Sequence, residues 1–186
     1  MKALVFDTEA TGLISSRLLK HEQLPEVIEF YGAVCNFTKA GKFKIEQELE
    51  LLIKPANMIQ EYKTGKHNIA KITGITNAML VAAPTFKDVA NQIFSMLEAA
   101  PLAIAHNISY DTEVLTIEAE RLGYQIKWPQ RLCTVEATTY LRGDRLKLSE
   151  LHELLFKEKF AGAHRAKVDV QALIRCCAEL HKQGVI

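Results

Sequence analysis

Several features are missing from this sequence of 186 residues, and each absence narrows the class of protein. No apolar run reaches the roughly 18 residues that a membrane-spanning helix requires, so we expect no membrane partner. The first apolar run ends at the acid Asp7 and is too short for the apolar core of a secretory signal. These two absences predict a cytoplasmic protein.

Cysteine occurs only four times, and its spacing argues against a disulfide framework. The four cysteines show no C-x-x-C pair and no even distribution: Cys35, Cys133, Cys176 and Cys177. Such cysteines are typical of small buried side chains in a reducing compartment.

The chain also lacks a strong excess of charge of one sign, because its formal net charge is +1. Net charge by itself therefore gives no indication of a polyanionic partner. Residues 127–167 nevertheless hold nine Lys or Arg against five Asp or Glu. This stretch, with Arg165 and Lys167, fits either contacts with phosphates or a solvated surface of mixed charge.

Repeats, low-complexity tracts and Gly/Ser linkers are absent as well, which predicts a single domain over residues 1–186. Apolar and β-forming runs predict strands over residues 2–8, 27–37, 43–53, 101–106 and 132–134. Helical periodicity and capping signals predict helices over residues 86–98, 109–122, 134–142, 149–157 and 165–182. Residues 54–84, broken by Pro and Gly, are expected to be irregular with short helical pieces.

The order of these elements indicates an α/β fold. Three strands come first, the second and third of them joined by the short polar segment 38–42, and two strands connected through a helix follow later. A mixed sheet with an antiparallel half and a parallel half, covered by helices, fits this order.

Asp7 and Glu9 stand at the end of the first expected strand. Because side chains alternate along a strand, the two carboxylates face the same side, roughly 7 Å apart. Two acids this close repel each other unless a cation or a proton compensates them, and carboxylate oxygens suit Mg²⁺ or Mn²⁺. Taken alone, the pair fits an exposed polar strand end at least as well.

Three further residues are ambiguous when each is considered singly. Asp111 follows a strand and lies in the first turn of a helix, where any acid is favoured. Asp169 shares a helix face with Leu173 and Cys176, and an acid on an apolar face is costly unless paired or ligating. His164 lies in a loop, where a histidine is usually an ordinary surface residue.

Together these residues resemble the three motifs of the DEDDh (DnaQ-like) 3′→5′ exonuclease family. The segments concerned are Asp7-Thr8-Glu9-Ala10-Thr11-Gly12-Leu13, Ala105-His106-Asn107 with Asp111, and His164-x₄-Asp169. Val27-Ile28-Glu29 and Ile72-Thr73-Gly74-Ile75-Thr76 are also similar to family segments, and the resemblance spans about residues 3–180. It implies a ribonuclease H-like fold with a five-stranded mixed sheet, three strands antiparallel and two parallel, flanked by helices.

The resemblance also implies residue roles. Asp7, Glu9, Asp111 and Asp169 become the ligands of two divalent cations, Mg²⁺ or Mn²⁺, and His164 becomes the general base. An imidazole has a reference pKa of about 6.5 and can accept a proton near neutral pH.

The substrate implied is the 3′ end of a nucleic acid, expected to be single-stranded, with DNA favoured over RNA. Thr8, Glu9 and His164 would lie near the terminal nucleotide, and Leu13 would pack against the terminal bases. Core packing is the alternative for Leu13. A polymerase and a second copy of the chain are both compatible partners.

Two departures from the family pattern concern the fit of the substrate end. Ala10 stands where bacterial proofreading members commonly have threonine. Residues 29–34 carry one residue more than the usual spacing, which we expect to form a β-bulge.

Other functions stay open at this point. The same family includes RNA-trimming exoribonucleases and oligoribonucleases, and related sheets carry ribonuclease H-type endonucleases. A non-catalytic nucleic-acid-binding module is a weaker alternative, because unused clustered carboxylates destabilise a fold.

Overall fold

The computed structural model describes residues 1–14, 20–61, 68–162 and 164–186. Part of the stretch expected to be irregular, residues 62–67, lies outside the described residues. The strands are β1 (Lys2–Ala10), β2 (Val27–Phe37), β3 (Phe43–Leu52), β4 (Leu102–Ala105) and β5 (Gln130–Cys133). The helices are α1 (Ile69–Thr73), α2 (Asn77–Leu80), α3 (Phe86–Glu98), α4 (Ile108–Arg121), α5 (Thr134–Thr138), α6 (Leu148–Phe156) and α7 (Ala166–Lys182), with 3₁₀ turns η1 (His21–Gln23) and η2 (Thr139–Leu141).

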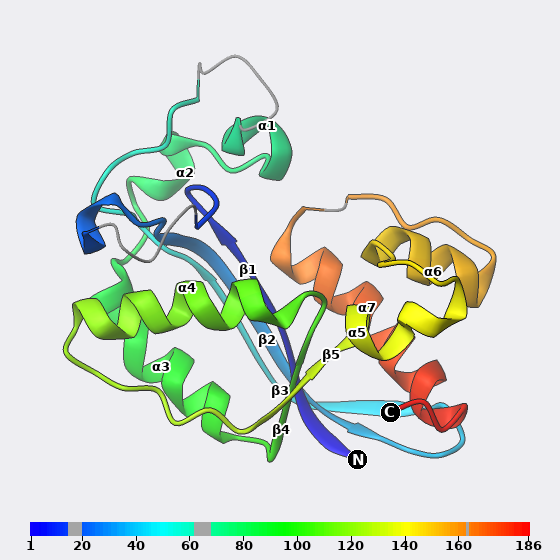
Figure 1. The fold of residues 1–186 in the computed structure, drawn as a ribbon. Helices are drawn as coiled ribbons and strands as arrows, with labels where there is room; N and C mark the ends of the chain where they lie inside the picture. Colours follow the sequence, from blue (N-terminus) through cyan, green and yellow to red (C-terminus); the bar gives the residue numbers. More distant parts are fainter. Residues whose placement is uncertain (15–19, 62–67, 163) are drawn as a thin grey trace.

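One five-stranded mixed sheet forms the centre, in the order β3-β2-β1-β4-β5 (Figure 1). β1, β2 and β3 are antiparallel, whereas β4 and β5 run parallel to β1. The expected fold class, with three antiparallel strands and two parallel ones, is confirmed.

β1 is central because it is apolar on both faces. Ala3, Leu4, Val5 and Phe6 are all fully buried, which suits a strand covered by helices on each side. The strand runs two residues beyond the expected end, to Ala10, because it stays paired with β2.

The bulge expected within residues 29–34 is wrong. Glu29 to Val34 pair without interruption against Glu9 to Leu4 of β1. The register instead shifts one step earlier, where Glu9 faces Glu29 but Ala10 faces Val27. Ile28 is therefore the extra residue, next to the end of β1 that carries the acids.

Helices α3 and α4 cover one face of the sheet (Figure 1). Thr85 caps the start of α3, and its amide donates to the Asp88 carboxylate at 2.8 Å, as the capping pattern predicts. α4 ends at Arg121, two residues before Gly123. The φ of Gly123 is 70°, in the left-handed region that glycine adopts without strain. Leu4, Phe6 and Ala10 of β1 face this layer.

Helix α7 covers the other face, where Ala3 and Val5 of β1 pack against Val170 and Leu173 (Figure 1). α6 packs on α7 through Leu151, Cys176 and Leu180. The expected helix over residues 134–142 is divided into α5 and η2.

The four cysteines are buried, as their spacing in the sequence predicts. Cys35, Cys133, Cys176 and Cys177 are all buried free thiols. Within the described part of the chain, no helix has both the length and the apolar character needed to cross a bilayer.

Candidate active site

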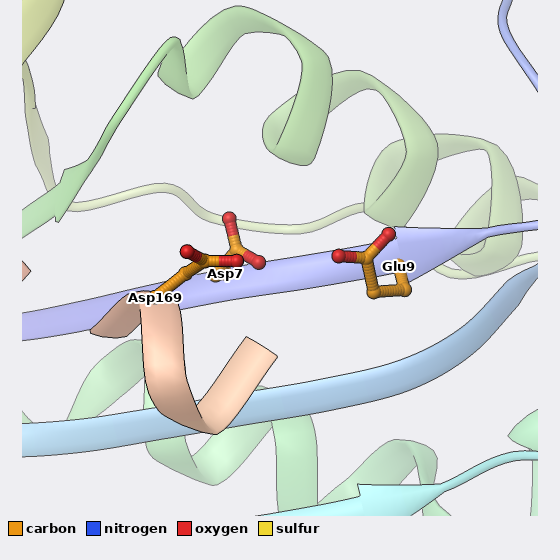
Figure 2. A group of neighbouring side chains, drawn as sticks. All are labelled: Asp7, Glu9 and Asp169. Atoms are coloured by element: carbon orange, nitrogen blue, oxygen red, sulfur yellow. The ribbon is translucent and has the colours of Figure 1, made fainter. Parts of the chain in front are cut away.

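Asp7 and Glu9 lie near the carboxyl end of β1 and point to the face covered by α7 (Figure 2). Strand alternation accounts for this, because the odd-numbered neighbours Ala3 and Val5 pack against the same helix. The intervening residue, Thr8, points to the opposite face, towards α4.

Asp169 completes a group of three acids. It lies in the first turn of α7, and Figure 2 shows its carboxylate beside that of Asp7. One ligand oxygen from each of Asp7, Glu9 and Asp169 lies within 4.8 Å of the other two. We name these three residues the acid trio.

The acid trio is electrostatically unfavourable without a compensating charge. Burial, and then the nearby acids with Asp111 foremost, raises the pKa of Asp7 well above its ordinary range. Burial and the charge of Asp169 raise the pKa of Glu9 from 4.5 to about 8, and burial raises the pKa of Asp169. Because neighbouring carboxylates repel each other when they are ionised, a hard divalent cation such as Mg²⁺ or Mn²⁺ would stabilise this cluster of oxygen ligands.

Asp111 stands apart from the acid trio. It lies in the first turn of α4, on the opposite layer of helices, and is buried. Its Oδ1 accepts hydrogen bonds from the Thr8 amide at 2.9 Å and from the Thr8 hydroxyl at 2.8 Å. It still belongs to the same neighbourhood, because its charge is the foremost of the acid charges that raise the pKa of Asp7.

His164 lies at the edge of the acid trio, immediately before α7. Its backbone N–H donates to Oδ2 of Asp169 at 2.7 Å, and its φ is 71°. A non-glycine residue held at positive φ is uncommon, and such residues occur often at functional sites. The His164 side chain is exposed and borders a cavity of about 610 Å³ that also borders the acid trio.

A half-buried ion pair that the sequence did not reveal fixes this loop to the sheet. Glu29 of β2 is 1% exposed, and its Oε1 lies 2.7 Å from Nη2 of Arg165. Glu29 Oε2 also accepts from the Ala166 N–H at 2.9 Å. Arg165 is thus paired rather than free, and Lys167 pairs with Glu50 at 2.6 Å.

His106 and Asn107, from the second motif, also border the cavity. His106 Nε2 lies 3.0 Å from the Leu146 carbonyl oxygen, and Nδ1 lies 2.9 Å from the Thr134 hydroxyl. Burial lowers the pKa of His106 to about 4, so the ring is neutral and Nε2 carries the donated proton. Asn107 Oδ1 accepts from Arg145 Nη2 at 3.0 Å.

Leu13 is 70% exposed, so core packing is wrong for this residue. It borders a second cavity of about 300 Å³, together with Met58 and Ile59. The neighbouring turn is held by Tyr110, whose hydroxyl donates to the Gly12 carbonyl oxygen at 2.7 Å.

Comparison with known proteins places this geometry in context. The model of the Exonuclease family (RNase_T) matches residues 4–177. The chain is 31% identical to DNA polymerase III PolC-type of Caldanaerobacter subterraneus subsp. tengcongensis, over 98% of the chain but 12% of that protein. It is 28% identical to DNA polymerase III subunit epsilon of Buchnera aphidicola subsp. Schizaphis graminum, over 88% of the chain and 66% of that subunit.

Solved structures share the fold at low identity. The nuclease domain of 3′hExo, described as a DEDDh family member bound to rAMP, superposes with a TM-score of 0.75 at 15% identity. The alignment covers 98% of this chain and 92% of that one. Exonuclease X in complex with 5′ overhanging duplex DNA gives a TM-score of 0.67 at 21% identity, over 98% and 93% of the two chains.

Proposed function

The chain belongs to the exonuclease family, and from that premise we propose that it removes nucleotides from the 3′ end of DNA as nucleoside monophosphates. The observation that carries the proposal is the acid trio, whose ligand oxygens lie within 4.8 Å of one another, beside a cavity that His164 also borders. Residues 1–186 would act as a single DEDDh exonuclease domain.

Phosphodiester hydrolysis is slow because the negative ester repels the nucleophile and the alkoxide leaves poorly. Two divalent cations, Mg²⁺ or Mn²⁺, stabilise the attacking and leaving oxygens when they are bound. In the proposal Asp7, Glu9 and Asp169 hold these cations, and Asp111 completes the set from the side of Asp7. Thr8 supports this arrangement by fixing Asp111 Oδ1.

His164 is proposed to accept the proton of the attacking water. Its side chain is exposed at the cavity and is therefore accessible to a bound strand. Its backbone bond to Asp169 connects the base to the acid trio without using the imidazole. A general base positioned in this way contributes about 10²- to 10⁴-fold to the rate.

The terminal nucleotide is proposed to lie over the end of β1. Glu9 and the backbone near Thr8 would contact the 3′ hydroxyl. Leu13, largely exposed, would pack against the terminal base, and such apolar contacts tolerate any base.

DNA is preferred over RNA in this proposal because two relatives are named as DNA polymerase III proteins. The chain spans only part of these relatives, 12% and 66%, so a polymerase partner is likewise a proposal, as is self-association. A cytoplasmic location is also part of the proposal.

A nuclease assay tests the proposed function directly. Single-stranded DNA and RNA of one sequence, labelled at the 5′ or the 3′ end, would be incubated with Mg²⁺, Mn²⁺ or chelator. We expect a ladder that shortens from the 3′ end, release of mononucleotides, faster cleavage of DNA and no cleavage in chelator. Cleavage of a circular strand would favour an endonuclease, and faster cleavage of RNA would favour an exoribonuclease.

A further inference from the structure

The cavity beside the acid trio has a second border of opposite charge. Arg145 and Lys147 lie there, in the segment between η2 and α6, and both side chains are exposed. We name residues 145–147 the basic ledge. It faces the same space as Asp7, Glu9 and Asp169.

Arg145 differs from most arginines of the described chain in its partner. Four others pair with carboxylates: Arg121 with Glu118, Arg142 with Asp144, Arg165 with Glu29, and Arg175 with Glu158. Arg145 instead donates from Nη2 to the neutral side-chain amide of Asn107 at 3.0 Å. The amide orients the guanidinium, and no carboxylate in the part of the chain that the structure describes pairs with it, so its charge and the other N–H groups of the fork are available.

The backbone of the basic ledge is fixed, although its side chains are exposed. Leu146 is 2% exposed, and its carbonyl oxygen accepts from His106 at 3.0 Å. The Lys147 N–H donates to Glu150 Oε2 at 2.8 Å, which starts α6. Neither bond uses the ammonium group of Lys147.

We propose that the basic ledge is a binding subsite for a phosphodiester group of the substrate strand, one other than the group being hydrolysed. The acid trio repels a polyanion, so the strand needs cations nearby to approach it. A guanidinium fork matches phosphate oxygens in pairs, and an ammonium adds a point charge. The inference rests on the proposed function and adds the part of the site that holds the remainder of the strand.

Two substrates separate this subsite from the chemistry. Thymidine 5′-(p-nitrophenyl phosphate) contains one phosphodiester, whereas a single-stranded oligonucleotide contains many. For Arg145→Met we expect KM for the oligonucleotide to rise about ten- to hundred-fold, the range for a charged hydrogen bond. KM for the nitrophenyl ester and kcat for both substrates should stay within about twofold of wild type.

Charge and geometry are separated by further variants. Lys147→Met should raise the oligonucleotide KM less than Arg145→Met, and Arg145→Lys should fall between wild type and Arg145→Met. The matched control is Arg131→Met, which removes one exposed arginine charge from β5 at a residue that does not border the cavity. It should leave every constant near wild type.

Oligonucleotide binding in chelator gives a readout that needs no turnover. Fluorescence anisotropy of a labelled oligonucleotide should show weaker binding by Arg145→Met, with the slope of log K against log salt reduced by about 0.7. Equal dissociation constants for wild type and Arg145→Met, or no binding by wild type, would overturn the subsite. If wild type hydrolyses neither substrate with Mg²⁺ or Mn²⁺, the proposed function fails instead, whatever the anisotropy shows.

Discussion

Two arginines lie near the candidate site, Arg145 at the border of its cavity and Arg165 next to His164, and they differ in their partners. Arg165 meets the Glu29 carboxylate, which is 1% exposed, and so secures the start of α7 to the sheet. Among the described residues, Arg145 bonds the neutral amide of Asn107 and no carboxylate, so its charge is left for another partner. The comparison sharpens our proposal: the arginine that a carboxylate neutralises supports the fold, and the arginine that bonds an amide is left to bind substrate.

Both segments are fixed, but by different chemistry. The border at the start of α7 is fixed by the Arg165–Glu29 ion pair and by the backbone hydrogen bond from His164 to Asp169. These contacts position His164 and the Asp169 carboxylate. The ledge border uses the neutral His106 ring and Asn107 amide, together with the bond from the Lys147 backbone N–H to Glu150, and the Arg145 charge enters no ion pair with a described residue. We therefore expect changes on the α7 border to lower kcat, and changes on the ledge to raise KM.

The largest expected effect follows from removing a charge of the acid trio. Asp169→Asn keeps the shape of the side chain but removes a ligand charge, so cleavage and tight Mn²⁺ binding should both be lost. Isothermal calorimetry with Mn²⁺ and the labelled-oligonucleotide assay measure the two losses. Glu98→Gln, an exposed acid at the end of α3, is the control and should resemble wild type. Unchanged Mn²⁺ affinity in Asp169→Asn would remove this acid from the site.

Loss of the proposed base comes next. His164→Asn should lower kcat by about 10²- to 10⁴-fold with Mn²⁺ affinity retained, because the bond to Asp169 uses the backbone N–H. Asparagine suits this position, since it tolerates the positive φ of 71°. Full activity of this variant would exclude His164 from the mechanism.

Breaking the Glu29–Arg165 pair should lower kcat by a smaller factor, about tenfold. This factor corresponds to an increase of about 1.4 kcal/mol in the activation free energy when His164 and Asp169 are less well positioned. Arg165→Met leaves the Glu29 charge buried without its partner, which destabilises the fold by about 1–3 kcal/mol. Adding Glu29→Gln removes that charge, so the double variant should be more stable than Arg165→Met alone.

Steady-state kinetics and urea unfolding measure both effects for the two single variants and the double variant. KM for the oligonucleotide should stay near wild type in all three. A KM rise in Arg165→Met equal to that of Arg145→Met would break the comparison between the two arginines.

The smallest expected effect is a dependence of stability on pH in chelator. The folded-state pKa of Glu9 is raised from 4.5 to about 8, mainly by burial, and the pKa values of Asp7 and Asp111 are raised in the same direction. A raised folded pKa gives stability that is fully present below the unfolded pKa and is lost as pH rises through the folded one.

Tm in chelator should therefore fall between pH 5 and pH 8, by about 2–4 °C for each kcal/mol lost. Differential scanning fluorimetry measures this fall, and Mn²⁺ should reduce it, because the cation compensates the ionised acids. Glu9→Gln should show a shallower dependence. A Tm that rises over this pH range in chelator would contradict the electrostatics of the acid trio.

Much of the fold follows from local patterns in the sequence. The apolar run after Lys2 forms the central strand, the Thr85–Asp88 cap starts α3, and Gly123 follows the end of α4. These features depend on neighbouring residues, whose spacing the sequence states directly. The errors concern boundaries and the expected bulge, where pairing with another strand decides the register.

The candidate site was predictable in part. Strand alternation alone places Asp7 and Glu9 on one face, and the family resemblance points to Asp111, His164 and Asp169. No local pattern predicted that Asp111 bonds Thr8 across 103 residues, or that Arg165 pairs with Glu29 across 136. For Arg165 the sequence left phosphate contact and solvated surface equally open.

The sequence by itself determined which residues have the chemistry for this site, because acid, imidazole and guanidinium groups and their local periodicity are fixed covalently. The tertiary structure alone decided which of them meet. It brings Asp169 to Asp7 and Glu9, and it gives Arg165 a carboxylate while Arg145 receives an amide. The physical reason is that charge compensation depends on distances of a few ångströms between segments far apart in the chain, and only the packing of α4 and α7 against the sheet sets those distances.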